Sequence, residues 1–251
     1  MAKQAGVMQV EGTVGNMTFF KTKDGYQARL KSGISAQRIK TDPKFARTRE
    51  NMAEFGRAGS AGKLLRTAMA TAVQQVKDSN MVPRLAAEML RAVRADATST
   101  RGLRNVLDGE LELLQGFEFN AASPLTTTLF APFITTIDRA AGTLKASFAP
   151  YQPSALISAP GGATHYSIML AGAEIDFTNN VYVSGVNTSA VLPLDTNPTV
   201  QLDLSVNVTA ASTVPLFLAV GITFLQSVNG KEYALNNGAF NALSLVKVLG
   251  L

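Results

Sequence analysis

His165 is the residue best suited to acid–base chemistry, and it is the single histidine of the 251-residue chain. A histidine base works only with a nucleophile and a carboxylate held beside it. Nothing in the sequence brings Ser167 or Asp176 to that position, and a lone histidine at the start of a predicted strand is typical of a packing or surface site. We therefore expect no catalytic residues and a protein that is not an enzyme.

Metal binding is the next chemistry to consider, and the candidate carboxylates around the predicted strands are Asp138, Glu174, Asp176, Asp195 and Asp203. Calcium requires clustered oxygen ligands, and no Asp-x-Asp-x-Asp run is present. The chain has no cysteine, which excludes disulfides, cysteine-ligated zinc and iron–sulfur clusters. We expect no metal site and no cofactor.

Glycines recur at every third position in the segment Gly56, Gly59 and Gly62. The spacing differs from that of a phosphate-binding loop, and no core strand precedes it. Each glycine costs a helix interior about 1 kcal/mol relative to alanine. Two explanations stand equally: the glycines let another backbone approach one helix closely, or residues 43–77 form two helices with a break here.

Positive charge is concentrated in the first half of the chain. Residues 1–118 contain 19 Lys and Arg against 12 Asp and Glu, a net charge of +7, whereas residues 119–251 contain 4 against 6, a net charge of −2. One interpretation is a nucleic-acid surface with interleaved aromatic residues. Its candidate residues are Lys21, Lys23, Arg29, Lys31, Arg38 and Lys40.

The favoured interpretation of this basic half is docking on a protein surface. Acidic residues are interspersed at Asp24, Asp42, Glu50 and Glu54, and the predicted hairpin needs a surface to lie on. We expect the partner to be another copy of the chain. The candidate inter-subunit residues are Phe19, Phe20, Tyr26, Arg29, Gly56, Gly59 and Gly62.

The elements that position these residues follow from turn and cap signals. Residues 1–41 are predicted to be an extended basic arm, in which Asn16–Lys21 and Tyr26–Leu30 form a hairpin around a turn at residues 24–25. An isolated hairpin is only marginally stable in water. Residues 42–118 are predicted to be helical, since Asp42-Pro43 is a strong helix start, and a second helix spans residues 83–97.

Residues 119–251 change to an alternating pattern that predicts short strands. The clearest hairpin surrounds Asn229-Gly230. Seven to nine real strands in a segment of this length favour an antiparallel immunoglobulin-like β-sandwich, so the predicted fold class is α+β. The strand candidates are 126–130, 133–137, 143–148, 166–170, 174–177, 181–186, 200–208, 216–226, 231–235 and 243–248, with residues 111–119 as a further one.

A resemblance covers about residues 10–70. The segments GTVGNMTFFKTKDGY (residues 12–26) and DPKFARTRENMAEFGRA (residues 42–58) are similar to those of an uncharacterised protein family from Bacteroidota genomes. The resemblance implies no activity and no catalytic residue. It favours a structural or particle-associated role over metabolism.

The function predicted is that of a structural subunit that self-assembles into a filament, tube or shell, with phage or phage-like origin as one source. The alternatives are a nucleic-acid-binding or packaging protein, and a carbohydrate- or surface-binding module using the loops around Gly161 and Asn179–Asn180. The N-terminus lacks the apolar segment of a signal peptide, and no apolar run is long enough to cross a membrane. We expect synthesis in the cytoplasm without a Sec signal, no membrane span, and incorporation into a released particle or extracellular assembly.

Overall fold

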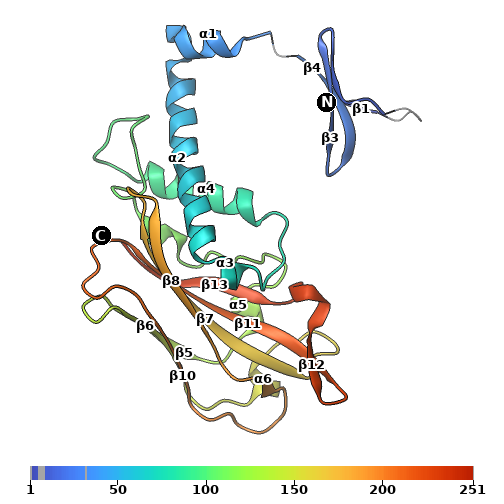
Figure 1. Cartoon of the computed structure of the whole chain (residues 1–251), viewed down its shortest axis with the longest axis vertical. Helices are drawn as coiled ribbons and strands as arrows, with labels where there is room; N and C mark the ends of the chain where they lie inside the picture. Colours follow the sequence, from blue (N-terminus) through green and yellow to red (C-terminus); the bar gives the residue numbers. More distant parts are fainter. Residues whose placement is uncertain (1, 5–8, 32, 251) are drawn as a thin grey trace. The chain divides into compact units, whose positions relative to one another are not determined.

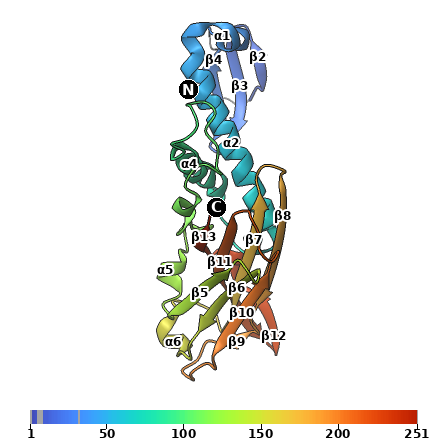
Figure 2. The ribbon, with the colours of Figure 1, turned by 90° about the vertical axis from the view of Figure 1, so that its left-hand side faces the viewer.

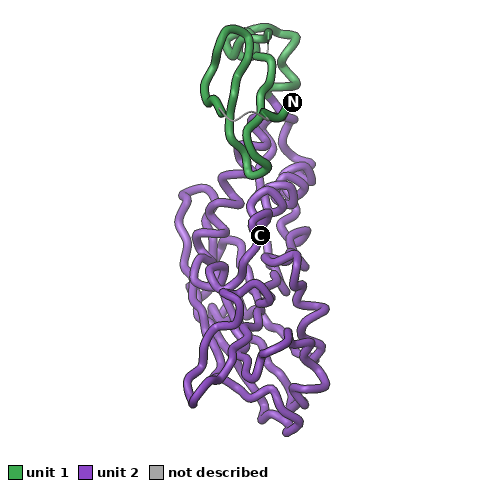
Figure 3. The backbone as a smooth tube through the Cα atoms, turned by 90° about the vertical axis from the view of Figure 1, so that its right-hand side faces the viewer, with its two compact units in different colours: residues 1–49 green, residues 50–251 purple. Residues whose placement is uncertain are grey.

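The computed structural model describes residues 2–4, 9–31 and 33–250. The chain separates into two compact units, Met1–Arg49 and Glu50–Leu251 (Figure 3). The single division lies inside the segment that was predicted to be helical, and residues 50–118 belong to the same unit as the strands that follow. The division into three regions, with boundaries after residues 41 and 118, stays a prediction.

The first unit contains a four-stranded antiparallel sheet with the order β1-β4-β3-β2. Its strands are β1 (Ala2–Lys3), β2 (Gly12–Val14), β3 (Met17–Thr22) and β4 (Gly25–Leu30). The predicted hairpin is confirmed as β3 and β4, which pair from Met17↔Leu30 to Thr22↔Gly25. Gly25 closes the turn with a φ of 103°, a conformation that favours glycine.

A short helix follows the sheet, where the sequence predicted an extended arm. Helix α1 (Ala36–Thr41) begins at Ser35, whose hydroxyl accepts a hydrogen bond from the N–H of Arg38. Asp42 then caps a 3-10 turn, Pro43–Phe45, by accepting from the N–H of Lys44 at 3.0 Å. Residues 36–41 of the predicted arm are therefore helical rather than extended.

Helix α2 (Ala46–Ala68) runs without interruption through Gly56, Gly59 and Gly62. The break comes later, at Met69, whose φ of −98° and ψ of 18° are not helical, and α3 (Ala70–Val73) follows. The glycines therefore do not divide the helix. The second predicted helix is confirmed as α4 (Met81–Arg94), which buries one apolar side: Met81, Leu85, Met89, Ala92 and Val93.

The strands of the second unit form two antiparallel sheets (Figure 1, Figure 2). The smaller sheet has the order β10-β6-β5, with β5 (Phe133–Asp138), β6 (Thr143–Phe148) and β10 (Leu202–Asn207). The larger sheet is centred on the long strands β7 (His165–Asp176) and β11 (Leu216–Val228). Strands β8 (Val181–Thr188) and β9 (Leu192–Pro193) pair with β7, and β12 (Lys231–Ala234) and β13 (Ala242–Leu249) pair with β11.

The centre of the larger sheet, along β7 and the first part of β11, is buried on both of its faces. Toward the smaller sheet, Leu170 packs in one cluster with Leu144 and Val206. Toward the helices, Phe217 packs in another cluster with Leu65 of α2 and Leu85 of α4. Strand β7 is consequently buried almost continuously instead of at alternate residues. The helical region and the strands share one core, which explains why they form one compact unit.

Some predicted strands are wrong or displaced. Residues 125–128 form α5 (Leu125–Thr128), in which the hydroxyls of Thr127 and Thr128 donate to the carbonyl of Pro124. Leu111–Leu114 is a 3-10 turn, and only the next few residues pair with β13, where the N–H of Phe119 donates to Leu243 at 2.8 Å. Another short helix, α6 (Pro153–Leu156), precedes β7. Among the helices of residues 2–4, 9–31 and 33–250, none combines the length and hydropathy needed to cross a lipid bilayer.

Candidate docking surfaces

One face of the N-terminal sheet is apolar. Strand register places Met17 opposite Leu30, Phe19 opposite Ala28 and Lys21 opposite Tyr26. Paired residues of neighbouring strands share a face, and Val14 joins this face because it pairs with Met17. We call this surface the apolar face: Val14, Met17, Phe19, Lys21, Tyr26, Ala28 and Leu30.

The apolar face is largely exposed. Leu30 is 74% exposed, Val14 65% and Met17 38%. Among the described residues up to Arg49, Ala28 is the one apolar side chain that is buried. A small sheet is stabilised when its hydrophobic face is covered, and here Val14, Met17 and Leu30 lack such cover in the single chain.

The aromatic docking candidates are divided between the two faces of this sheet. Phe19 and Tyr26 lie on the apolar face, where the Lys21 ammonium is 5.3 Å from the centre of the Tyr26 ring. Phe20 lies on the opposite face, and the Arg29 guanidinium is 5.3 Å from its ring centre. Cation–π pairs at exposed sites contribute about 0.5–1 kcal/mol. Both pairs are contacts within the hairpin and stabilise it.

The nucleic-acid candidates do not gather on one face. Lys21 and Arg29 lie on opposite faces, and Lys23 is in the turn between their strands. The N–H of Lys31 donates to Asn16 just beyond β4. Arg38 and Lys40 are on α1, where Arg38 pairs with Asp42 at 3.3 Å.

The two compact units of the structure differ in net charge more clearly than the two halves of the sequence do. Residues 1–49 contain ten Lys and Arg against three Asp and Glu, a net charge of +7. Residues 50–251 contain 13 against 15, a net charge of −2. All of the excess positive charge therefore belongs to the first unit, and the helical residues of the second unit contribute none.

The three glycines of α2 have different surroundings. A Cβ atom at Gly62 would lie 3.6 Å from Cγ atoms of both Leu85 and Met89, so this glycine is covered by α4. At Gly56 and Gly59 an added Cβ would have no atom within 4 Å. Gly62 is used inside the unit, whereas Gly56 and Gly59 leave α2 open to an external contact.

Gly59 lies over a shallow apolar hollow of about 280 Å³ between α2 and the start of α4. Phe55 and Val82 at this hollow are 57% and 47% exposed. Exposed aromatic and aliphatic side chains beside a glycine suit a protein contact better than a polar ligand. The hollow is the part of the α2 surface that agrees best with the docking prediction.

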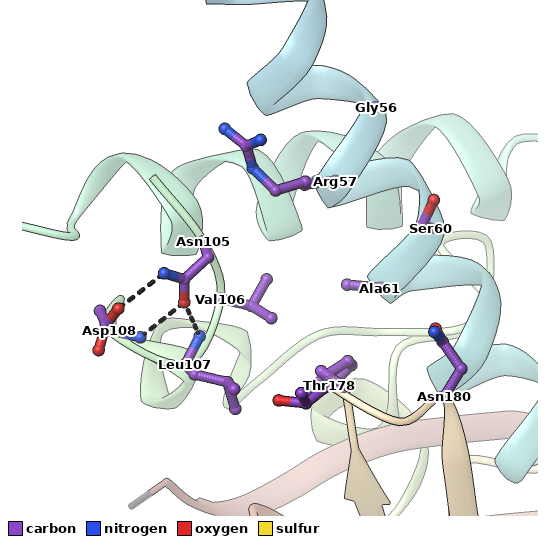
Figure 4. A pocket seen from close by; sticks show the side chains of 11 residues that line it. Gly56, Arg57, Ser60, Ala61, Asn105, Val106, Leu107, Asp108, Thr178 and Asn180 are labelled. Carbon is purple, nitrogen blue, oxygen red and sulfur yellow. Dashed lines mark hydrogen bonds between the residues drawn. The ribbon is translucent and has the colours of Figure 1, made fainter. Parts of the chain in front are cut away.

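Gly56 borders a larger pocket of about 690 Å³, formed by α2, residues 105–108 and the turn after β7 (Figure 4). Three of the six polar side chains around it, those of Arg57, Asn105 and Asp108, are already engaged. Asn105 donates to Asp108 at 2.7 Å and accepts from the N–H groups of Leu107 and Asp108. Arg57 donates to the carbonyl oxygens of Gly102 and Arg104. These contacts fix one side of the pocket wall, and Ser60, Thr178 and Asn180 supply the other polar side chains of its lining.

Asp96 anchors the loop that forms this wall, and the sequence analysis missed it. Its buried carboxylate accepts from the N–H groups of Ser99, Thr98 and Asn105 at 2.8, 2.9 and 3.1 Å, and from the Thr98 hydroxyl. The Ser99 N–H contributes most to lowering the pKa of Asp96; burial opposes this shift, and Asn105 and Thr98 add to it. The Asp-x-Thr-Ser order is typical of an Asx turn and is the signal that predicts this anchor.

The residues considered for catalysis do not form a site. The His165 Nδ1 lies 2.9 Å from the Thr164 hydroxyl, and the Ser167 hydroxyl lies 2.6 Å from that of Thr223. Asp176 is at the far end of β7, where its carboxylate accepts from the N–H groups of Thr178 and Asn179.

The other carboxylates also have local roles. Asp138 accepts from the N–H of Ala141, Asp195 from the N–H of Asn197, and Glu174 from the N–H of Thr209. Asp203 accepts from the Gln201 side chain at 2.8 Å. Within the described ranges, no three His, Asp or Glu side chains form a group that could hold a metal ion.

A carbohydrate site would need exposed aromatic rings, and two of the four tyrosines of the second unit are not exposed. Tyr151 and Tyr166 are buried, and their hydroxyl oxygens lie 2.9 Å apart. Burial raises the pKa of both hydroxyls. Tyr182 and Tyr233 are 42% and 55% exposed, so only these two could stack on a ligand in the second unit.

The chain matches none of the protein-family models, curated proteins or solved structures with which it was compared. The resemblance over residues 10–70 stays a prediction from the sequence. The functional argument therefore depends on the surfaces of the chain itself.

Proposed function

We propose that this protein is a non-enzymatic structural subunit that self-assembles into a filament, tube or shell, and that its first unit docks on a neighbouring copy. The observation that carries the proposal is the exposed apolar face of the N-terminal sheet. Ala28 is the one buried apolar side chain in the described part of that unit, although Val14 and Leu30 on the same face are 65% and 74% exposed.

The energetics support a protein partner. Full burial of a Val, Leu or Met side chain stabilises by about 1.5–3 kcal/mol. Covering Val14, Met17 and Leu30 therefore contributes on the order of 5 kcal/mol, a useful part of the cost of association. A protein surface supplies the apolar cover that water and nucleic-acid phosphates do not.

The second unit, in this proposal, supplies the bulk of the assembly through an immunoglobulin-like sandwich. Its sheet orders, β10-β6-β5 and β13-β11-β7-β8, place β10 beside β6 and β11 beside β7. Such pairing of strands distant in sequence is a feature of Greek-key sandwiches. The phage-like origin and the release of the assembly from the cell are proposed on sequence grounds.

Val14→Glu combined with Leu30→Glu is expected to abolish assembly, because two charges would be buried in the interface. Both side chains are exposed in the single chain, so folding should be unaffected. Sedimentation velocity over a range of concentrations and negative-stain microscopy measure the result.

Ala36→Glu with Thr48→Glu is the matched control. It adds the same charge to exposed positions of the same unit, on helices α1 and α2 and so outside the N-terminal sheet. The control should assemble like the wild type. A wild-type protein that stays monomeric at every concentration, or a V14E/L30E variant that assembles normally, would contradict the proposal.

Nucleic-acid binding is the second candidate, favoured by the confinement of the net charge of +7 to residues 1–49. For binding to duplex DNA, the logarithm of affinity falls with that of salt concentration by about 0.9 per phosphate contacted. Replacing Lys21, Lys23, Arg29 and Lys31 by glutamine should reduce that slope by about 3–4 if all four bind phosphates. Fluorescence anisotropy with labelled DNA and RNA measures it.

The control replaces four exposed basic residues of the second unit by glutamine: Lys63, Lys77, Arg94 and Lys231. It should leave the salt slope unchanged. Equal slopes for the two variants, or no binding by the wild type at low salt, would reject this second candidate.

A further inference from the structure

Strand β8 is an open edge of the larger sheet. It pairs with β7 along residues 181–188, and no other strand of the described chain pairs with it. Ser189, just after β8, donates its N–H to Ile168 of β7. Along an antiparallel strand, successive backbone N–H groups point alternately toward and away from the paired strand. The N–H of Ser189 points toward β7, so the N–H groups of Tyr182, Ser184, Val186 and Thr188 point away from it.

This edge lacks the features that usually prevent strand addition. Its sequence, VYVSGVNT, contains no charged residue and no proline, although lysine, proline and inward charges are the common protections. Val181, Tyr182 and Val183 are 56%, 42% and 45% exposed. An edge that is long, uncharged and apolar is expected to be covered by another strand in the functional state.

The surroundings of the edge are acidic. Register places Glu174 opposite Val183 and Asp176 opposite Val181. The same side chains, with Tyr182 and Val214, line a hollow of about 220 Å³. A strand that binds here meets apolar groups beside two carboxylates, which favours a basic and partly apolar partner.

The first unit of the chain has these properties. It carries a net charge of +7, it exposes Val14 and Leu30, and Lys21 lies on the same face. Its outer strand β2 (Gly12–Val14) is uncharged and, among the described residues, pairs only with β3.

We infer that the β8 edge is the acceptor for the N-terminal unit of a second copy, whose β2 extends the larger sheet by strand addition. This inference rests on the proposed function and adds the surface that receives the docking unit. Each copy then has one donor and one acceptor that differ. Such an interface is heterologous, and it produces rings or open filaments instead of closed twofold dimers.

Tyr182→Lys combined with Val186→Lys tests the acceptor. Both side chains are exposed, at 42% and 36%, and lysines on this edge would repel the basic donor and block strand addition. We expect loss of polymers with an unchanged circular dichroism spectrum. Ile134→Lys with Val200→Lys is the control, because Ile134 is on the edge strand β5 and both residues are exposed, at 72% and 81%.

Mixing the two assembly-deficient variants gives the decisive result. The V14E/L30E variant retains its acceptor, and the Y182K/V186K variant retains its donor. Each alone should stay monomeric, whereas an equimolar mixture should form a one-to-one complex in sedimentation velocity.

The outcomes separate the inference from the proposed function. If Y182K/V186K assembles like the wild type while V14E/L30E does not, the donor is correct and the acceptor lies elsewhere. If both variants are monomeric but the mixture forms no complex, strand addition at β8 is rejected. Normal assembly by V14E/L30E rejects the proposed function itself.

Discussion

Phe217→Ala is expected to lower the free energy of unfolding by about 3–5 kcal/mol, the usual cost of truncating a fully buried phenylalanine. The Phe217 side chain is completely buried. It lies in the cluster shared by α2, α4 and the larger sheet, with its ring centre 6.1 Å from that of Phe177. The cavity would open between the helices and the larger sheet, so the variant should lose stability in the helices and in the strands together.

Urea denaturation followed by circular dichroism and by tyrosine fluorescence measures the effect. The two probes should give one coincident transition for residues 50–251, displaced to lower urea in the variant. Phe240→Ala is the control, because Phe240 is 42% exposed, and it should change stability far less. Helices that melt in a separate transition from the strands would contradict the shared core.

Gly109→Ala is expected to destabilise the protein by about 3 kcal/mol, the upper end of the usual cost of overpacking. A Cβ atom at Gly109 would lie 2.2 Å from the carbonyl oxygen of Ala92 and 3.0 Å from its carbonyl carbon. Both contacts are with the backbone of α4, which no side-chain rotation can relieve. The loop after α4 would have to move away from the helix.

Gly59→Ala is the matched control for Gly109→Ala. Its Cβ would have no neighbour within 4 Å in the single chain, and alanine stabilises a helix interior by roughly 0.5–1 kcal/mol relative to glycine. Thermal unfolding should therefore show opposite shifts for the two variants. A Gly109→Ala protein as stable as the wild type would show that the loop does not approach Ala92 this closely.

Local signals made part of the fold predictable. The hairpin at residues 17–30 depends on Asp24-Gly25, and the hairpin of β11 and β12 depends on Asn229 and Gly230, with φ values of 52° and 76°. Helix α4 follows from its apolar periodicity. In each case the deciding residues are adjacent or one helical turn apart, and a pattern in the sequence records them directly.

The arrangement in layers could not be predicted in this way. Burial of β7 on both faces depends on helices that lie about a hundred residues earlier, and an apolar run does not say which element covers it. Residues 126–130 were predicted to be a strand in a threonine-rich segment, yet the Thr128 hydroxyl donates to the carbonyl of Pro124 at 2.8 Å in the short helix α5.

The spatial arrangement of the docking surfaces could not be predicted from the sequence either. The predicted residues Phe19, Tyr26, Phe20 and Arg29 do belong to one small sheet, but alternate residues of a strand face opposite sides, which separates them into two pairs. The open edge of β8 depends on which strands lie next to it. No residue within residues 181–188 reveals that, in the described chain, β7 is the one strand that pairs with β8.

The buried contact between Tyr151 and Tyr166 gives this chain an internal spectroscopic probe. The sequence contains five tyrosines and no tryptophan, so tyrosine dominates its near-ultraviolet absorption and emission. Two of the five share a hydrogen bond inside the second unit, and Tyr26 is the single tyrosine of the first. Replacing Tyr26 by phenylalanine would leave a protein whose tyrosine signal comes from the second unit alone, so that opening of its interior could be followed in intact assemblies without an added label.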